Sequence, residues 1–144
     1  YTTDDGLPSS ETYRALQDRK GFIWIATDKG VSRYDGYSFQ NFSIKDGLPD
    51  NSVLNIFMDD IGRVWFVSLS LRLSYWNGDK IITYPYNNII SNELGSDLPC
   101  AFFADGEDNV WMSGYMHGCI KIDAKGKTKK YINTNPKYLY INNL

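Results

Sequence analysis

The sequence is poor in histidine and cysteine, which zinc sites and disulfide scaffolds require. It has one histidine, His117, and two cysteines, Cys100 and Cys119. Two cysteines are too few for a disulfide scaffold, and a single histidine cannot complete a zinc site with them. No Gly-x-Ser-x-Gly, phosphate-loop or His-Glu-x-x-His motif occurs either. We therefore expect no cofactor, no metal and no catalytic residue in this chain.

Long apolar runs and an excess of charge of one sign are also missing. No run of 18 apolar residues occurs and no signal-peptide pattern opens the sequence, so no membrane-spanning helix is expected within it. The formal net charge of −2 and the pI near 5.3 argue against nucleic acid or anionic lipid as a partner. One short basic cluster is predicted to be a solvated hairpin end: Lys125, Lys127, Lys129 and Lys130.

What the sequence does contain is an internal repeat marked by tryptophan. Hydrophobic residues make up 42% of the chain and aromatic residues 15%, which is enough for a packed core. Three copies align on Trp24, Trp65 and Trp111, which are spaced by 41 and 46 residues. The repeats span about 4–45, 46–91 and 92–132.

Two turns flank each tryptophan. Six residues before it stands an aspartate, and three residues before it stands a glycine or, in the third copy, an aspartate; both types suit a hairpin turn that needs a positive φ. These first-turn residues are Asp18, Gly21, Asp59, Gly62, Asp105 and Asp108. A second turn follows the tryptophan at Asp35-Gly36, Asn77-Gly78 and residues 123–126. Asp-Gly and Asn-Gly pairs are strong hairpin signals.

Short runs rich in aromatic and β-branched residues lie between these turns. They are of strand length, and none keeps a helical period of 3.6 residues. In the second copy they predict strands at about 53–58, 64–68, 71–77 and 80–86. A four-stranded antiparallel meander that recurs every 40 to 50 residues is a β-propeller blade. The sequence therefore predicts an all-β chain of about three blades.

The same residues resemble a known repeat. The first copy follows the pattern D-x-x-G-x-[IV]-W-x-x-[TS]-x-x-G-[LV]-x-R-Y-D-G from Asp18 to Gly36, and "DGLPDNSV" at 46–53 precedes the second copy. "DDGLPSS" at 4–10 repeats that linker 41 residues earlier. These motifs resemble the two-component regulator propeller repeat of bacterial sensor kinases. The third copy is degenerate: residues 92–95 take the linker's place, and Pro99 stands where Val53 does.

The resemblance, which covers about residues 4–132, implies a function and a location. It implies a sensor domain in the periplasmic, extracytoplasmic part of an inner-membrane protein, usually from a Bacteroidetes bacterium. The parent would be a sensor histidine kinase, simple or hybrid. In hybrid members the ligand is often an oligosaccharide, which makes an oligosaccharide or another small ligand the expected partner.

Three blades do not close a propeller, which has about four to eight. They would leave two apolar blade faces open, so we expect the N-terminal piece of a larger propeller whose remaining blades cover them. The isolated fragment is expected to self-associate, or the parent to dimerise. Tyr1 to Thr3 aligns with the end of an outer strand and is expected to lack a partner. Residues 133–144 either begin the next blade or form a disordered tail.

Residues that recur in every copy are interpreted as framework, and residues where the copies differ as candidates for recognition. The three tryptophans are predicted to be core, and Thr27, Ser68 and Gly114 to end strands. The candidate ligand-binding residues lie in the loops between the second and third strands. They are Asp28, Lys29, Ser70, Tyr115, Met116 and His117.

Three function classes stay open. The leading hypothesis is a non-enzymatic, ligand-sensing propeller segment of a transmembrane two-component sensor. The second is a propeller enzyme acting on polysaccharide, a glycosidase or lyase, for which the non-repeating acids are Glu11, Glu93 and Glu107. The third is a protein-interaction scaffold. Cys100 and Cys119 are predicted on the first and third strands of one blade, about 10 Å apart, and hence as two buried free thiols.

Overall fold

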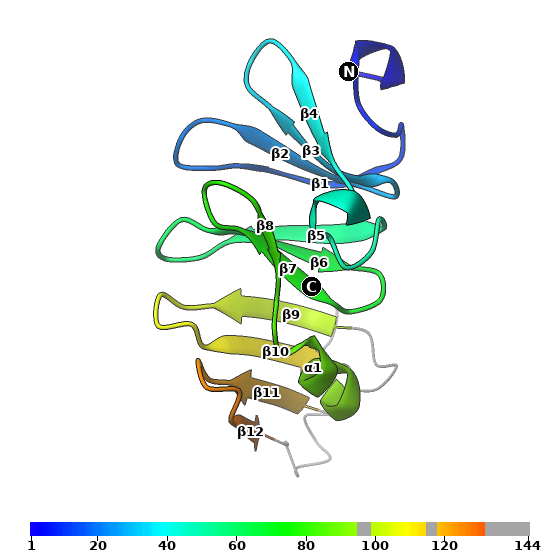
Figure 1. The fold of residues 1–144 in the computed structure, drawn as a ribbon. Coiled ribbons are helices and arrows are strands. Elements are labelled where there is room, and N and C mark those ends of the chain that lie inside the picture. Colours follow the sequence, from blue (N-terminus) through cyan, green and yellow to red (C-terminus); the bar gives the residue numbers. More distant parts are fainter. Residues whose placement is uncertain (95–98, 115–117, 132–144) are drawn as a thin grey trace, which may run out of the picture.

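The computed structural model describes residues 1–94, 99–114 and 118–131. Within these ranges the chain forms three four-stranded antiparallel sheets, stacked along the molecule (Figure 1). Blade 1 consists of β1 (Thr12–Gln17), β2 (Ile23–Thr27), β3 (Gly30–Tyr34) and β4 (Phe39–Phe42). Blade 2 consists of β5 (Val53–Met58), β6 (Val64–Ser68), β7 (Leu73–Trp76) and β8 (Ile81–Thr83). Blade 3 consists of β9 (Pro99–Ala104), β10 (Val110–Gly114), β11 (Gly118–Ile122) and β12 (Thr128–Tyr131). The prediction of an all-β chain with three blades is confirmed.

Each blade is a simple meander, with consecutive strands hydrogen-bonded in order. The repeat extends to an irregularity that the sequence did not reveal: the register between the first two strands shifts by one residue in every blade. Pro99 pairs with Gly114 as Val53 pairs with Ser68, so the alignment of Pro99 with Val53 is confirmed. A shift of this kind is a β-bulge, which bends the strand and increases its twist.

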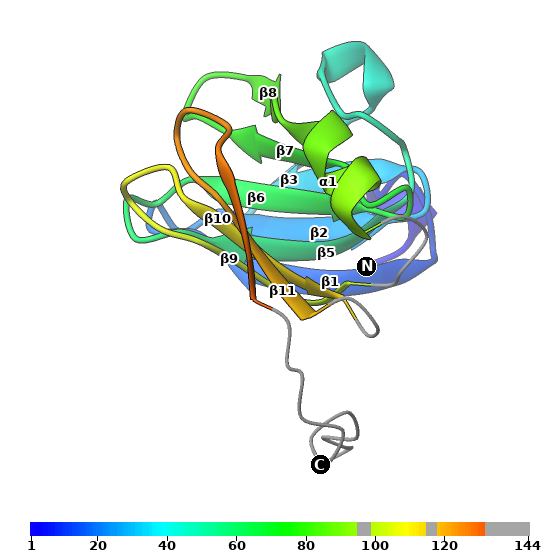
Figure 2. The same ribbon diagram turned by 90° about the horizontal axis from the view of Figure 1, so that it is seen from below.

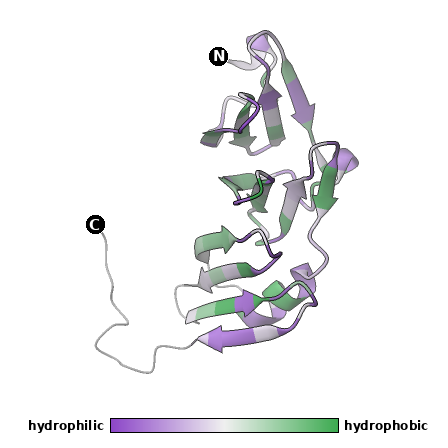
Figure 3. Cartoon of the chain, turned by 90° about the vertical axis from the view of Figure 1, so that its left-hand side faces the viewer, coloured by the Kyte–Doolittle hydropathy of each residue, from purple (hydrophilic) through white to green (hydrophobic). Residues whose placement is uncertain are grey.

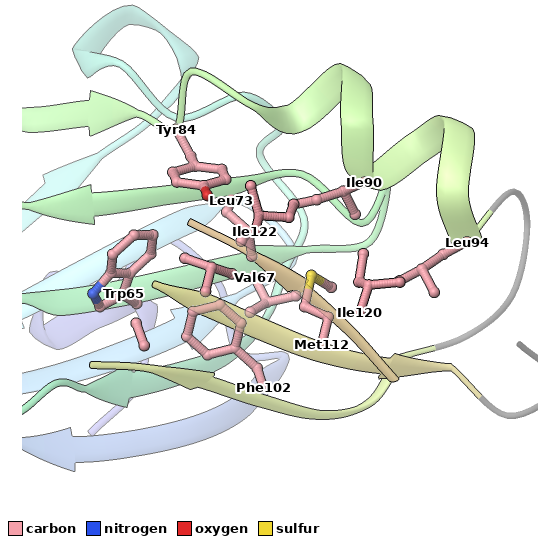
Figure 4. Packing of buried hydrophobic residues seen from close by; sticks show 12 residues of the cluster. Trp65, Val67, Leu73, Tyr84, Ile90, Leu94, Phe102, Met112, Ile120 and Ile122 are labelled. Carbon is pink, nitrogen blue, oxygen red and sulfur yellow. The ribbon is translucent and has the colours of Figure 1, made fainter. Parts of the chain in front are cut away.

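The hydrophobic core lies between the blades because the central strand of each blade presents apolar side chains on both faces. In β6, Trp65 and Val67 point toward blade 3, whereas Val64 and Phe66 point toward blade 1. The ring centroid of Trp65 lies 5.5 Å from that of Phe102 in blade 3. Figure 4 shows this cluster between blades 2 and 3. A residue's parity along the strand thus decides which neighbouring blade it contacts.

The linkers before blades 1 and 2 fold alike. Short 3₁₀ helices, η1 (Thr3–Asp5) and η2 (Ile44–Asp46), each begin with a capping box, formed by Thr2 with Asp5 and by Ser43 with Asp46. Each helix ends at a glycine with positive φ. Tyr1 to Thr3 pair with no strand of the described residues, and the ring of Tyr1 packs on Tyr34 and Phe39 of blade 1.

The linker before blade 3 is a helix that the sequence analysis missed. Helix α1 (Asn87–Leu94) buries Ile90 and Leu94 against the core between blades 2 and 3. Asn87 anchors it, since its side-chain amide exchanges two hydrogen bonds, of 2.7 and 2.9 Å, with the backbone of Leu73. The predicted fourth strand at 80–86 is shorter in the structure, ending at Thr83. Figure 2 shows α1 at the same edge of the sheets as η2.

Trp111 departs from the prediction that all three tryptophans are core. Trp24 and Trp65 are buried, but Trp111 is only half-buried. Its position in the alternation of β10 directs it away from blade 2. On that open face it stacks on Tyr131 of its own blade. The same face carries Phe103, which is 52% exposed. In Figure 3 the outer strand β12, with its lysines, is hydrophilic, whereas the central strands carry hydrophobic bands.

The two cysteines occupy the predicted strands, β9 for Cys100 and β11 for Cys119, with β10 between them. Cys119 is a free thiol, and partial burial raises its pKa. It is half-buried rather than fully buried, because it lies on the face of β11 opposite to Ile120 and Ile122, which are buried in the core between blades 2 and 3. Its sulfur lies 3.8 Å from the carbonyl oxygen of Ile120.

Candidate functional site at the blade junctions

The first turn of each repeat is organised by its aspartate, as predicted. The carboxylate of Asp18 accepts hydrogen bonds from the backbone N–H groups of Lys20 and Phe22, and Gly21 has φ of 89°. It also accepts a 2.8 Å bond from the indole nitrogen of Trp24. Asp18 and Trp24 are therefore one structural unit, which satisfies the indole N–H and fixes the ring at the junction.

The same unit in blade 2 is joined to blade 3 by an arginine. The carboxylate of Asp59 accepts bonds from the indole nitrogen of Trp65 at 2.9 Å and from Nε of Arg63 at 2.6 Å. Arg63 also forms an ion pair with Asp108, in the first turn of blade 3. Burial alone would lower the pKa of Arg63, but hydrogen bonds and charge from the two aspartates raise it. One guanidinium thus holds the turns of two blades together.

Blade 3 repeats the turn with different chemistry. Asp108 takes the place of the glycine with φ of 63°, so the prediction that aspartate tolerates this conformation is confirmed. Burial of Asp105 opposes ionisation, but hydrogen bonds from the side chain and backbone of Asn109 and from the backbone of Glu107 outweigh it and lower the pKa of Asp105. The recurring aspartates are turn residues, each bound by its own loop.

The second turns also form as predicted. Oδ1 of Asp35 accepts from two backbone N–H groups, and Oδ1 of Asn77 does the same in blade 2. Gly36 and Gly78 have φ of 102° and 103°. Oδ1 of Asp123 accepts from the backbone N–H groups of Lys125 and Lys127 in the β11–β12 turn, which confirms that the basic cluster begins at a hairpin end, and these bonds lower the pKa of Asp123.

Two of the candidate ligand loops lie close together at the linker edge. The backbone oxygen of Asp28 accepts a 3.3 Å bond from the hydroxyl of Ser52, and the backbone oxygen of Ser52 accepts a 2.7 Å bond from the N–H of Leu69. Lys29 and Ser70 are exposed beside this bridge. Oδ1 of Asp28 is buried without a hydrogen-bond partner among the described residues. Ser52 therefore joins the loops of blades 1 and 2.

The remaining candidates, Tyr115, Met116 and His117, lie outside the described residues. The predicted strand-end roles of Thr27 and Ser68 are confirmed, since both hydroxyls donate to a backbone oxygen across the loop, at 2.9 Å in each case. In the β6–β7 loop Leu71 has φ of 60°, a conformation that costs energy for a side chain of this size.

Cavities open at the opposite edge, between the first turns of neighbouring blades. Cavity A lies between blades 1 and 2 and measures about 290 Å³; its lining includes Arg19, Lys20 and Trp76. Cavity B lies between blades 2 and 3 and measures about 150 Å³, and half of its lining residues are aromatic. Its lining residues are Arg63, Trp65, Tyr75, Tyr84, Pro85, Tyr86, Asp108 and Ala124.

The acids considered for catalysis are not brought together. Glu93 is on α1, where it forms an ion pair with Lys130, and Glu107 is in the β9–β10 turn at the opposite edge (Figure 1). Glu11 accepts a 2.7 Å bond from the hydroxyl of Tyr13, and this bond raises the pKa of Tyr13 to about 12. Among residues 1–94, 99–114 and 118–131, no three His, Cys, Asp or Glu side chains cluster as a metal would require.

Cavity B contains residues that sequence reasoning passed over. Arg63 stands where blade 1 has Phe22 and blade 3 has Asn109, so the copies disagree at this position. This difference between the copies was the sequence signal that could have marked Arg63 as a candidate. Tyr84 gave no signal, because it falls outside the repeat motif and acquires its contacts only when blades 2 and 3 pack.

The stacked four-stranded meanders define the class of the protein: a segment of a β-propeller. Its repeat also matches a family model. Residues 6–29 and 47–70 match the family model described as "two component regulator propeller", which confirms the resemblance for these two copies. Together the matches cover a third of the chain.

Solved structures support the fold. The chain is similar to the extracellular domain of the hybrid two-component system BT3049 from B. thetaiotaomicron, with 21% identity, a TM-score of 0.71 and coverage of 91% of this chain and 19% of that one. The extracellular domain of the hybrid two-component system BT4673 from the same organism is 15% identical, with a TM-score of 0.67 and coverage of 94% of this chain and 18% of that one. Virginiamycin B lyase from Staphylococcus aureus is 15% identical, with a TM-score of 0.64 and coverage of 91% of this chain and 44% of that one.

These similarities show a shared fold at low identity. The chain spans about a fifth of the length of the two sensor domains and less than half of the lyase. No curated protein sequence matches the chain. In the part of the chain that the structure describes, no helix is long and apolar enough to cross a membrane.

Proposed function

We propose that this chain is a non-enzymatic, ligand-sensing segment of the propeller in the extracytoplasmic part of a two-component sensor. The observation that carries the proposal is the match of two consecutive repeats, residues 6–29 and 47–70, to the two-component regulator propeller. The similarity to extracellular domains of hybrid two-component systems supports the same location. Fold alone does not fix function, because propellers with similar blades include a lyase.

The remaining blades of the parent are the proposed partners of this segment. On blade 1, Ile23 and Ile25 are half-buried on the face away from blade 2. On blade 3, Trp111 and Phe103 lie on the face away from blade 2, at the other end of the stack. Trp24 and Trp65 each pack on an aromatic ring of the following blade. A following blade would bury Trp111 in the same way, at about 25 cal/mol for each Å² removed from water.

The proposed mechanism starts at the linker edge. A ligand, an oligosaccharide or another small molecule, binds the loops that carry Asp28, Lys29 and Ser70. Because Ser52 hydrogen-bonds to both loops, binding there changes how blades 1 and 2 pack. In a dimeric sensor, such a change alters the spacing of the two protomers and hence the activity of a histidine kinase beyond the membrane.

The coding sequence on both sides of this chain provides the first test. We expect further propeller repeats, a membrane-spanning segment and kinase modules. A coding sequence that ends soon after a closing blade, without these modules, would favour the enzyme or the scaffold.

The second test measures autophosphorylation of the parent protein in membranes, with and without a panel of oligosaccharides. Lys29→Ala should abolish the response to the active oligosaccharide and leave basal phosphorylation unchanged. Lys20→Ala is the matched control, because Lys20 is also an exposed lysine but lies in the first turn, at the opposite edge. A full response in both variants would contradict the assignment of the loops, and no response of the wild type to any oligosaccharide would contradict carbohydrate sensing.

A further inference from the structure

Two residues that line cavity B each have a buried polar atom without a partner among the described residues. Nη2 of Arg63 and the hydroxyl of Tyr84 are both buried without a hydrogen bond to any described residue. Tyr84 as a whole is 5% exposed, and Figure 4 shows its side chain pointing from the end of β8 into the space between blades 2 and 3. Both residues line the same cavity. Buried polar atoms without partners are uncommon, because each costs free energy that a bound group would recover.

Four of the eight residues that line cavity B are aromatic. Trp65 is flanked by Tyr75 and Tyr84 at centroid distances of 4.7 and 5.6 Å, and Tyr86 meets Tyr84 edge-on at 5.5 Å. The hydroxyl of Tyr86 is already used, since it donates to the backbone oxygen of Ala124. Burial raises the pKa of Tyr84. The cavity therefore offers apolar faces and a neutral phenol hydroxyl.

The charges at the cavity argue against an anionic ligand. Arg63 is the one cation among the lining residues, and it is already paired with Asp59 and Asp108. One positive charge and two negative charges leave the group net negative. A neutral oxygen can still accept from Nη2 of Arg63, because that nitrogen has no partner among the described residues.

From these observations we infer that cavity B binds a small, neutral, hydroxylated ring. The aromatic walls would contact the ring face, and Arg63 and Tyr84 would bond its oxygen atoms. A volume of about 150 Å³ corresponds to roughly five water molecules at about 30 Å³ each, which suits one six-membered ring. A sugar ring and a phenol share this chemistry. The biological purpose of this site rests on the proposed sensor function. Binding of a ring to cavity B can nevertheless be measured without measuring signalling.

The test uses NMR of the 144-residue chain with four probes: glucose, phenol, and their carboxylate counterparts glucuronate and benzoate. The indole N–H of Trp65 reports on cavity B, and that of Trp24, at the other junction, is an internal control. We expect a neutral probe to shift the Trp65 signal with a Kd on the order of 1 mM and leave Trp24 unchanged. Its carboxylate counterpart should bind at least about fivefold more weakly. Glucose and phenol distinguish the two sources of the ring.

Two variants locate the binding. Tyr84→Phe removes only the unpartnered hydroxyl and should weaken binding by about tenfold. Tyr86→Phe is the matched control, because its hydroxyl is committed to Ala124, and it should keep the wild-type affinity. No shift of Trp65 with either neutral probe would overturn the inference, as would equal shifts of Trp24 or unchanged affinity in Tyr84→Phe. These outcomes leave the proposed sensor function standing, since it is tested by phosphorylation of the parent.

Discussion

The indole nitrogen of Trp65 lies 2.9 Å from Oδ2 of Asp59, six residues earlier in the chain, and Trp24 and Asp18 form the same bond at 2.8 Å. This Asp–Trp pair connects the hairpin turn of the repeat with the junction between blades. The aspartate closes the hairpin turn, and the tryptophan fills the junction between blades. Because one carboxylate serves both, the turn and the junction form together.

Asp59→Ala should therefore cost far more than the loss of a surface charge. The carboxylate is buried and accepts bonds from Ile61, Arg63 and Trp65, so its removal leaves buried donors unpaired. We expect the free energy of unfolding, measured in urea, to fall by about 3 kcal/mol. Asp79→Ala, in the exposed β7–β8 turn, is the control and should change it by less than about 0.5 kcal/mol. Similar losses in both variants would contradict the shared role of Asp59.

Trp24→Ala and Trp111→Ala should differ although the two residues occupy the same position of the repeat. Trp24 is fully buried between blades, and its truncation should cost about 3–5 kcal/mol. Trp111 is half-buried on an open face, so its truncation should cost less than half as much. Urea unfolding of both variants checks this. Equal decreases in the free energy of unfolding would mean that Trp111 is covered in solution.

The blade pattern was predictable because its determinants are local. An aspartate that bonds backbone N–H groups two and four residues on, as Asp18 does, works in any copy of the turn. The capping boxes of the linkers are equally local, and Thr2 and Ser43 occupy equivalent positions of the repeat. Motifs of this kind specify strand order and turn position without knowledge of the neighbouring blades.

Features that depend on contact between blades were not predictable from the sequence. Residues 87–94 lack a strong helix signal, and α1 forms because Ile90 and Leu94 fit the core between blades 2 and 3. The exposure of Trp111 depends on which blade covers it. The ion pair of Arg63 with Asp108 joins turns 45 residues apart, a separation that no local motif spans.

Tyr84→Phe should stabilise the protein when no ligand is bound. The hydroxyl of Tyr84 is buried and unpaired among the described residues, so the folded state carries its desolvation cost. Removing it should raise the free energy of unfolding by about 1 kcal/mol. Tyr86→Phe should instead lower it by about 1 kcal/mol, because that hydroxyl bonds Ala124. A loss of stability in Tyr84→Phe would show that a water molecule already satisfies the hydroxyl.

Acid should destabilise the third blade through Asp105. Hydrogen bonds from Asn109 and Glu107, which outweigh the effect of burial, lower the pKa of Asp105 from its ordinary value of 3.8. A carboxyl group with a lowered folded pKa stabilises the protein fully above the unfolded value, and this stability is lost as pH falls through the folded pKa. Asp105→Asn should therefore be less stable than wild type at pH 7, with the difference shrinking below about pH 3.8. Urea unfolding midpoints of both proteins at pH 7, 5 and 3 measure this. A stability difference between wild type and Asp105→Asn that grows on acidification would contradict the lowered pKa of Asp105.

The open face of blade 3 should drive self-association of the isolated chain. Phe103 is 52% exposed beside the half-buried Trp111, on a face of the kind that packs against a neighbour elsewhere in the chain. Phe103→Lys places a charge there and should shift the sedimentation velocity of the chain toward a monomer. Leu69→Lys is the control, since Leu69 is 55% exposed but lies in a loop at the linker edge. It should leave the association unchanged. A wild-type chain that sediments as a monomer at high concentration would show that the apolar faces are tolerated without a partner.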